Sequence, residues 1–153
     1  MADFESRLSS LGLSLPAVPT PVASYVPSAR VGNLVFVSGQ IPIRDGKLLA
    51  TGSIPAQVSV EEAQGLARQC VLNGLAVLAK EVGSIDRLKR VVRVGCFVSC
   101  TPGFGDQPKV ANGASDLLCE IFGEAGQHAR AAIGSVALPL NVPVEIEFLF
   151  EVE

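Results

Sequence analysis

Two charged residues near the C-terminus stand in segments that are otherwise apolar or built of small side chains. Arg130 lies among alanines in segment 128–134, and Glu145 lies in the alternating segment 144–152. A planar guanidinium holds a carboxylate through two parallel hydrogen bonds, which the point charge of lysine cannot copy. A carboxylate can orient a water molecule for attack. The same residues also fit an ordinary surface or interface arginine and a solvated strand glutamate, because charged side chains are mostly exposed.

The sequence argues against several other kinds of catalytic site. Its single histidine is His128, and its four cysteines, at positions 70, 96, 100 and 119, form no C-x-x-C pair. We therefore expect no metal site and no Ser-His-Asp or Cys-His arrangement. There is no phosphate-binding G-x-x-x-x-G-K-[ST] motif, and the glycines at 32, 39 and 46 do not make a G-x-G-x-x-G. We interpret the cysteines as reduced thiols that pack as small hydrophobic residues.

Length and composition predict one folded domain over residues 1–153. Apolar residues make up 48% of the chain and charged residues 18%, which is the reverse of the balance in a disordered chain. No apolar run approaches the ~18 residues of a membrane span. The N-terminus has no basic and apolar leader. We therefore expect a cytoplasmic protein with no membrane partner.

The charge balance argues against a nucleic-acid partner. Lysine and arginine number 12 against 15 aspartates and glutamates, which gives a net charge of −3. Proteins that bind nucleic acids normally carry a basic excess. The basic cluster at 87–93 has no interleaved aromatic residues. It therefore fits the solvated end of a strand better than a nucleic-acid patch.

The first 22 residues predict a helix followed by a proline-rich arm packed on the domain. Asp3 suits the N-cap of a short helix over 3–11. Four prolines within 15–27 exclude a regular helix there, so this segment is expected to be extended. The apolar residues that would pack it against the body are Leu15, Val18 and Val22.

The remainder of the chain alternates between strand and helix periodicity. Strands are predicted over 24–30, 34–40, 88–100, 128–138 and 144–152, a hairpin over 43–49, and helices over 59–82 and 106–122. In segment 144–152 apolar and mostly acidic residues alternate, so Glu145 lies on the face opposite the apolar one. The predicted fold class is an α+β two-layer sandwich, with a mostly antiparallel sheet covered by two helices on one face.

Several short segments are specific in combination. Segment 32–42 reads GNLVFVSGQIP, and the C-terminal part contains ARA at 129–131, ALP at 137–139 and VEIE at 144–147. Tyr25 precedes the strand at 34–40. Together these segments resemble the RidA (YjgF) family of reactive-intermediate enamine/imine deaminases. The similarity covers about residues 22–152, and the chain looks closest to the longer branch often labelled endoribonuclease L-PSP-like.

The resemblance implies a fold like that of chorismate mutase of the bacillus type, and a homotrimer with clefts between subunits. It also implies hydrolysis of enamine or imine intermediates, derived from amino acids, to 2-keto acids and ammonia without a cofactor. In that scheme Arg130 clamps the substrate carboxylate and Glu145 positions the attacking water. Tyr25 and Ser38 line the pocket, and the backbone of Gly39 contacts the substrate.

The chain departs from the family pattern at two places. Where the family often has a cysteine this chain has Ala132, of which only the backbone would contact substrate. The asparagine of the family's second helix has no convincing counterpart, although Asn112 and Ser115 are nearby. Two other functions stay open: a non-catalytic carboxylate-binding or regulatory trimer, and an endoribonuclease. The net negative charge and the lack of a histidine pair disfavour the endoribonuclease.

Overall fold

The computed structural model describes residues 3–18, 20–21 and 23–153. Its helices are α1 (Phe4–Ser10), α2 (Val60–Val82) and α3 (Gln107–Phe122). Its strands are β1 (Ser28–Val31), β2 (Leu34–Gln40), β3 (Ile43–Arg44), β4 (Lys47–Leu48), β5 (Leu88–Ser99), β6 (Ala129–Ser135) and β7 (Val144–Val152). Short 3-10 turns lie at Ile85–Arg87, Gly123–Gly126 and Pro139–Asn141.

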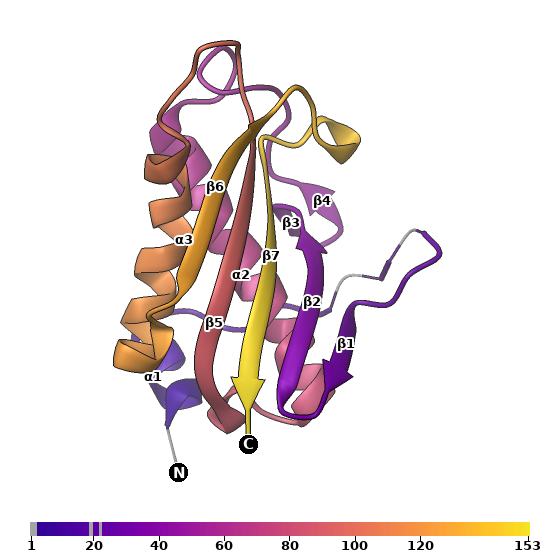
Figure 1. Cartoon of the computed structure of the whole chain (residues 1–153), viewed down its shortest axis with the longest axis vertical. Coiled ribbons are helices and arrows are strands. Elements are labelled where there is room, and N and C mark those ends of the chain that lie inside the picture. Colours follow the sequence, from indigo (N-terminus) through magenta and orange to yellow (C-terminus); the bar gives the residue numbers. More distant parts are fainter. Residues whose placement is uncertain (1–2, 19, 22) are drawn as a thin grey trace.

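The main sheet has the strand order β1-β2-β7-β5-β6, and α2 and α3 lie together on one of its faces (Figure 1). Three of its four strand pairs are antiparallel, and β6 runs parallel to β5 after the crossover through α3. This arrangement confirms the predicted two-layer α+β sandwich. The small hairpin β3–β4 turns at Asp45 and Gly46, whose φ angles of 53° and 75° fit a tight hairpin turn.

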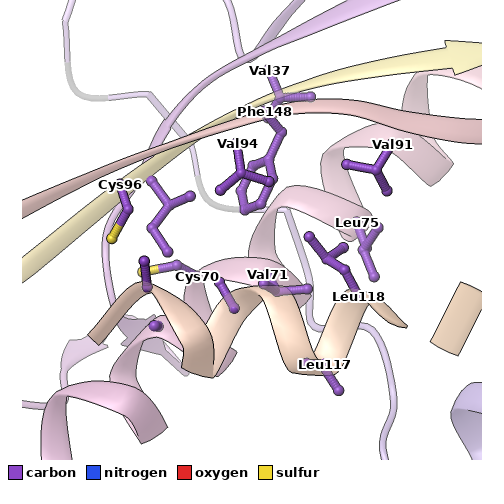
Figure 2. Packing of buried hydrophobic residues seen from close by; sticks show 14 of the residues in the cluster. Val37, Cys70, Val71, Leu75, Val91, Val94, Cys96, Leu117, Leu118 and Phe148 are labelled. Atoms are coloured by element: carbon purple, nitrogen blue, oxygen red, sulfur yellow. The ribbon is translucent and has the colours of Figure 1, made fainter. Parts of the chain in front are cut away.

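The core fills the space between the two helices and the covered sheet face (Figure 2). Fully burying an aliphatic or aromatic side chain contributes roughly 1.5–3 kcal/mol, so this cluster is the main source of stability. Gly74 of α2 is required by close packing, because a Cβ there would lie 2.6 Å from the ring of Phe148. The largest fully buried side chains include Leu75, Leu78, Leu117, Leu118, Ile121, Ile146 and Phe150.

Both ends of α2 are set by nearby residues in the sequence, a capping box at the start and a glycine at the end. The Ser59 hydroxyl accepts a hydrogen bond from the Glu62 backbone N–H at 3.1 Å, and the Glu62 carboxylate accepts one from the Ser59 N–H at 2.8 Å. This reciprocal pair is a capping box. Gly83 ends the helix at φ 95°, a left-handed conformation that favours glycine.

The N-terminal helix forms as predicted, but its cap is different. The side chain of Asp3 makes no capping hydrogen bond. Instead, Asp86 from the 3-10 turn before β5 accepts hydrogen bonds from the backbone N–H groups of Phe4 and Glu5, at 2.7 and 3.0 Å. Of the arm residues, Leu15 and Val18 pack against the core. Pro19 and Val22 lie outside the described residues.

Two predicted strands are too long at one end. The first begins at Ser28 rather than at residue 24, because Pro27 has no N–H to donate and the residues before it bend away. The strand predicted over 128–138 ends at Ser135, whose hydroxyl bonds the carbonyl of Ala137. The 3-10 turn Pro139–Asn141 then redirects the chain into β7. Within the described ranges, no helix combines the length and the apolar character needed to cross a membrane.

Candidate functional site

Arg130 and Glu145 lie on opposite faces of the sheet. Arg130 pairs with Val94, which is fully buried, and it points toward α3 on the helix-covered side. Glu145 is the register partner of Phe97 and alternates with the buried core positions of β7, so it faces the open side. A single chain therefore does not bring these two side chains into one cleft.

The guanidinium of Arg130 is exposed but anchored at one end. Its Nη1 donates to Asn112 Oδ1 at 2.8 Å and to Ser115 Oγ at 3.1 Å. A longer contact of 3.5 Å joins Nη2 to the carbonyl oxygen of Pro108. All three acceptors come from α3, where Asn112 and Ser115 are one turn apart and so face the same way. In the part of the chain that the structure describes, Nε has no hydrogen-bond partner and Nη2 has only the long contact to Pro108, so the Nε–Nη2 edge can bind a bidentate carboxylate.

Glu145 is a half-buried carboxylate packed against the backbone of Gly39. A Cβ on residue 39 would overlap Oε1 of Glu145, so only glycine leaves room for the acid. None of the described residues donates a hydrogen bond that would stabilise the charge of this carboxylate. Burial raises the pKa of Glu145 above its usual value, and the nearby negative charge of Glu147 adds to the rise. The group is therefore a stronger base than an exposed glutamate, with its lone pairs open to a water molecule.

The other predicted residues fall into two groups. Tyr25 and Ser38 line an open groove of about 610 Å³ on the same face as Glu147, and Tyr25 also borders a smaller hollow of about 120 Å³ lined by Gly39. The Ser38 hydroxyl donates to the carbonyl of Val26 at 2.7 Å, which fixes the segment that carries Tyr25. Ala132 is half-buried on the other face, two residues along β6 from Arg130.

The thiols are poor candidates for nucleophiles. Cys70 and Cys96 are buried and meet where α2 packs on the sheet (Figure 2). Burial raises the pKa of Cys96 to about 12 and raises the pKa of Cys70 well above its usual value. Cys100 is half-buried beside the Gln107 amide, at 3.8 Å. Across the described ranges, no group of histidine, cysteine and acidic residues could hold a metal ion.

Three cations of the basic cluster lie on β5 and pair with two neighbouring glutamates. Lys89 and Arg90 pair with Glu151 at 2.9 and 2.6 Å, and Arg93 pairs with Glu147 at 3.1 Å. These ion pairs agree with the interpretation of the cluster as a solvated strand end. Because Lys89 and Arg90 share the single carboxylate of Glu151, the ion pairs reduce the positive charge that the cluster offers to a phosphate backbone but do not cancel it.

Comparisons with known proteins agree on one family. The model described as "YjgF/chorismate_mutase-like, putative endoribonuclease" matches residues 5–152. Protein TCP17 of Trypanosoma cruzi is 42% identical over 147 residues, covering 95% of this chain and 92% of that protein. The 2-iminobutanoate/2-iminopropanoate deaminase of Dermatophagoides farinae is 31% identical over 141 residues, covering 92% and 95%. A crystal structure described as a "putative endoribonuclease" from Shewanella oneidensis aligns with a TM-score of 0.95 at 36% identity, covering 99% and 100%.

The chain therefore belongs to the YjgF/RidA family and has its chorismate-mutase-like α+β fold. The sequence motifs had pointed to Arg130 and Glu145, but not to the partners that hold the arginine. The motifs do not identify Asn112 and Ser115 as partners of Arg130, nor His128 as the residue that contacts Ser115. The available signal is the i, i+3 spacing of Asn112 and Ser115, which places both side chains on one face of the helix.

Proposed function

We propose that this protein hydrolyses the imines of amino-acid-derived substrates to 2-keto acids and ammonia. The observation that carries the proposal is the anchored guanidinium of Arg130, with an open bidentate edge, in a family that includes an iminobutanoate deaminase. The unpartnered, partly buried carboxylate of Glu145 supplies the second requirement, a base for water. No metal or cofactor enters the scheme.

The proposed reaction needs little more than positioning, because an imine carbon is already electrophilic. Arg130 holds the substrate carboxylate while Glu145 accepts a proton from water, whose oxygen bonds to the imine carbon. The proton taken up by Glu145 passes to the imine nitrogen, which receives the C=N π electrons, and the product is a carbinolamine. Proton transfer from its hydroxyl then expels ammonia as the C–N bond breaks and the C=O bond forms.

Because Arg130 and Glu145 lie on opposite sheet faces, the proposed site draws them from two chains. We propose a homotrimer in which the open sheet face is buried against neighbouring subunits. That face exposes apolar side chains, among them Phe36 at 46%, Ile133 at 51% and Val31 at 66% of their full accessible surface. Light scattering should give about three times the 15.9 kDa of one chain, and a monomer at micromolar concentration would contradict this proposal.

Ammonia release and semicarbazide competition with imines made from several amino acids test the activity directly. The parent should remove the imine before semicarbazide traps it. Arg130→Ala and Arg130→Lys should both lose most of kcat/KM, because lysine offers no fork. Glu145→Gln should lower kcat about 10²–10⁴-fold and leave carboxylate binding intact. Ser9→Ala, an exposed helical serine on α1, is the control that should behave like the parent.

Two outcomes would redirect the proposal. Binding of keto acids without ammonia release from any imine would favour the carboxylate-binding or regulatory trimer. RNA cleavage that survives Arg130→Ala would indicate a nuclease activity, or a contaminant, unrelated to this site. We further propose a cytoplasmic location, which the four unpaired cysteines support.

A further inference from the structure

A chain of hydrogen bonds leads from the guanidinium of Arg130 to an imidazole. Arg130 Nη1 donates to Ser115 Oγ at 3.1 Å, and Ser115 Oγ lies 2.8 Å from His128 Nε2. At the far end, His128 Nδ1 lies 2.6 Å from the carbonyl oxygen of Gly126. The proposed water attack uses neither Ser115 nor His128.

When His128 is neutral, the carbonyl of Gly126 fixes the direction of the bonds in this chain. A carbonyl oxygen can only accept, so Nδ1 of His128 carries the proton and donates it. In the neutral imidazole Nε2 is then an acceptor, and the hydroxyl of Ser115 must donate to it. The oxygen of Ser115 therefore turns its lone pairs toward Arg130, and its polarised hydroxyl is a better acceptor for the guanidinium.

The Ser115–His128 pair also has the spacing of a nucleophile and its general base. However, Ser115 lies in the interior of α3, where backbone N–H groups are bonded within the helix. No pair of backbone donors is left there to hold an oxyanion. The serine oxygen is moreover already bonded by Arg130. The geometry favours an orienting role over covalent catalysis.

We propose that Ser115 and His128 are positioning residues that fix the guanidinium of Arg130 for recognition of an α-carboxylate. The inference rests on the proposed function of Arg130. With Nη1 engaged by Asn112 and Ser115, rotation of the guanidinium about its stem is restricted, and the Nε–Nη2 edge, which carries only the 3.5 Å contact to Pro108, is left for the substrate. The chain from His128 thereby makes the site selective for imines of 2-amino acids over imines of simple amines.

Substitutions at Ser115 and His128 test this selectivity. Ser115→Ala should weaken 2-oxobutanoate binding about 3–10-fold, the effect of one hydrogen bond, and raise KM for amino-acid imines while kcat changes little. An imine of a simple amine, which has no carboxylate, should react with both proteins alike. His128→Leu should behave like Ser115→Ala, whereas Ser115→Thr and His128→Gln, which retain the hydroxyl and an acceptor, should restore binding. Ser9→Ala is the matched control.

A double-mutant cycle separates positioning from a general loss of structure. In the Arg130→Ala background, Ser115→Ala should cause no further loss of 2-oxobutanoate binding. The inference would be overturned if Ser115→Ala weakened 2-oxobutanoate binding as much in the Arg130→Ala background as in the parent. It would also be overturned if Ser115→Ala slowed hydrolysis of the simple-amine imine as much as that of the amino-acid imine. Labelling of Ser115 by a fluorophosphonate would also overturn it, since the serine would then be a nucleophile.

The failure of this inference can be told apart from the failure of the proposed function. If the parent hydrolyses no imine, the deaminase proposal fails. The positioning role can still be tested, by comparing the 2-oxobutanoate affinity of the parent with that of Ser115→Ala. If the parent binds no 2-oxobutanoate either, Arg130 is not a carboxylate site, and the positioning role falls with it.

Discussion

Replacing Gly39 with alanine tests whether the placement of the Glu145 carboxylate matters for turnover. An added Cβ would overlap Oε1 of Glu145 and approach its Cδ and Cγ to 3.0 and 3.1 Å, where ordinary contacts are 3.4–4 Å. The carboxylate must therefore move. The backbone of Gly39 is outside the left-handed region, so alanine introduces no conformational strain of its own.

The size of the effect follows from this overlap. Displacing a reacting group by ~1 Å can lower a rate about 10²-fold, so kcat for imine hydrolysis should fall by that order in Gly39→Ala. The extra methyl group should also destabilise the fold by roughly 1–3 kcal/mol, as overpacking does. Chemical denaturation and the initial rate of ammonia release measure the two effects separately on the same protein.

Two further variants separate the effect of displacing the Glu145 carboxylate from the effect of overpacking. Gly95→Ala is the matched control, because a Cβ there would lie 2.8 Å from the side chain of Glu147 on the same sheet face. It should lower stability without a comparable loss of kcat. In the Gly39→Ala background, Glu145→Asp shortens the acid by one methylene and should restore stability but not the rate. A folded Gly39→Ala protein with the parental kcat would refute the reasoning that Glu145 acts from this position.

Three other predictions follow from the structure. Burial and the negative charge of Glu147 raise the pKa of Glu145, and the base acts only when ionised, so activity is lost as the pH falls through that raised pKa. Glu147→Gln should shift the acidic limb of the kcat/KM profile to lower pH, and an unmoved limb would contradict this. A variant with all four cysteines replaced by alanine should be less stable, because the substitutions leave cavities in the core. It should keep its kcat per folded protein, because the buried thiols of Cys70 and Cys96 are not ionised at neutral pH. Loss of kcat in a folded variant would show that a cysteine takes part in the reaction. Asp86→Ala removes the two hydrogen bonds to the start of α1, so it should lower the free energy of unfolding by about 1 kcal/mol and speed amide exchange in α1. Its kcat should not change, and unchanged amide exchange would show that α1 needs no cap.

Much of the fold could be predicted because local signals agreed with the tertiary structure. The helix periodicity over 59–82 locates α2, and the alternation in 144–152 locates β7 and its buried face. Strand ends were less predictable, since the ends of β1 and β6 depend on a proline and on a hydroxyl contact to a later carbonyl. The cap of α1 was missed because Asp86 is far from it in sequence.

Only the site residues that lie in short sequence motifs could be predicted. Arg130 and Glu145 came from segments that resemble the family signature, and they remain predictions until activity is measured. The partners of Arg130 could not be read from the sequence, because Asn112 and Ser115 meet it only after α3 folds back over β6. Nor could a linear pattern show that Arg130 and Glu145 face opposite ways. That depends on which face of each strand α2 and α3 cover.

The placement of Arg130 and Glu145 on opposite faces of one sheet has a genetic consequence. For an active site that takes its arginine from one chain and its glutamate from the next, two inactive alleles can rescue each other. Co-expressed Arg130→Ala and Glu145→Gln chains would assemble mixed rings, in which some clefts carry both lesions and others carry neither. Such intragenic complementation would recover part of the activity from two inactive variants. Dilution of the mixed trimers to a concentration at which they dissociate would abolish that activity.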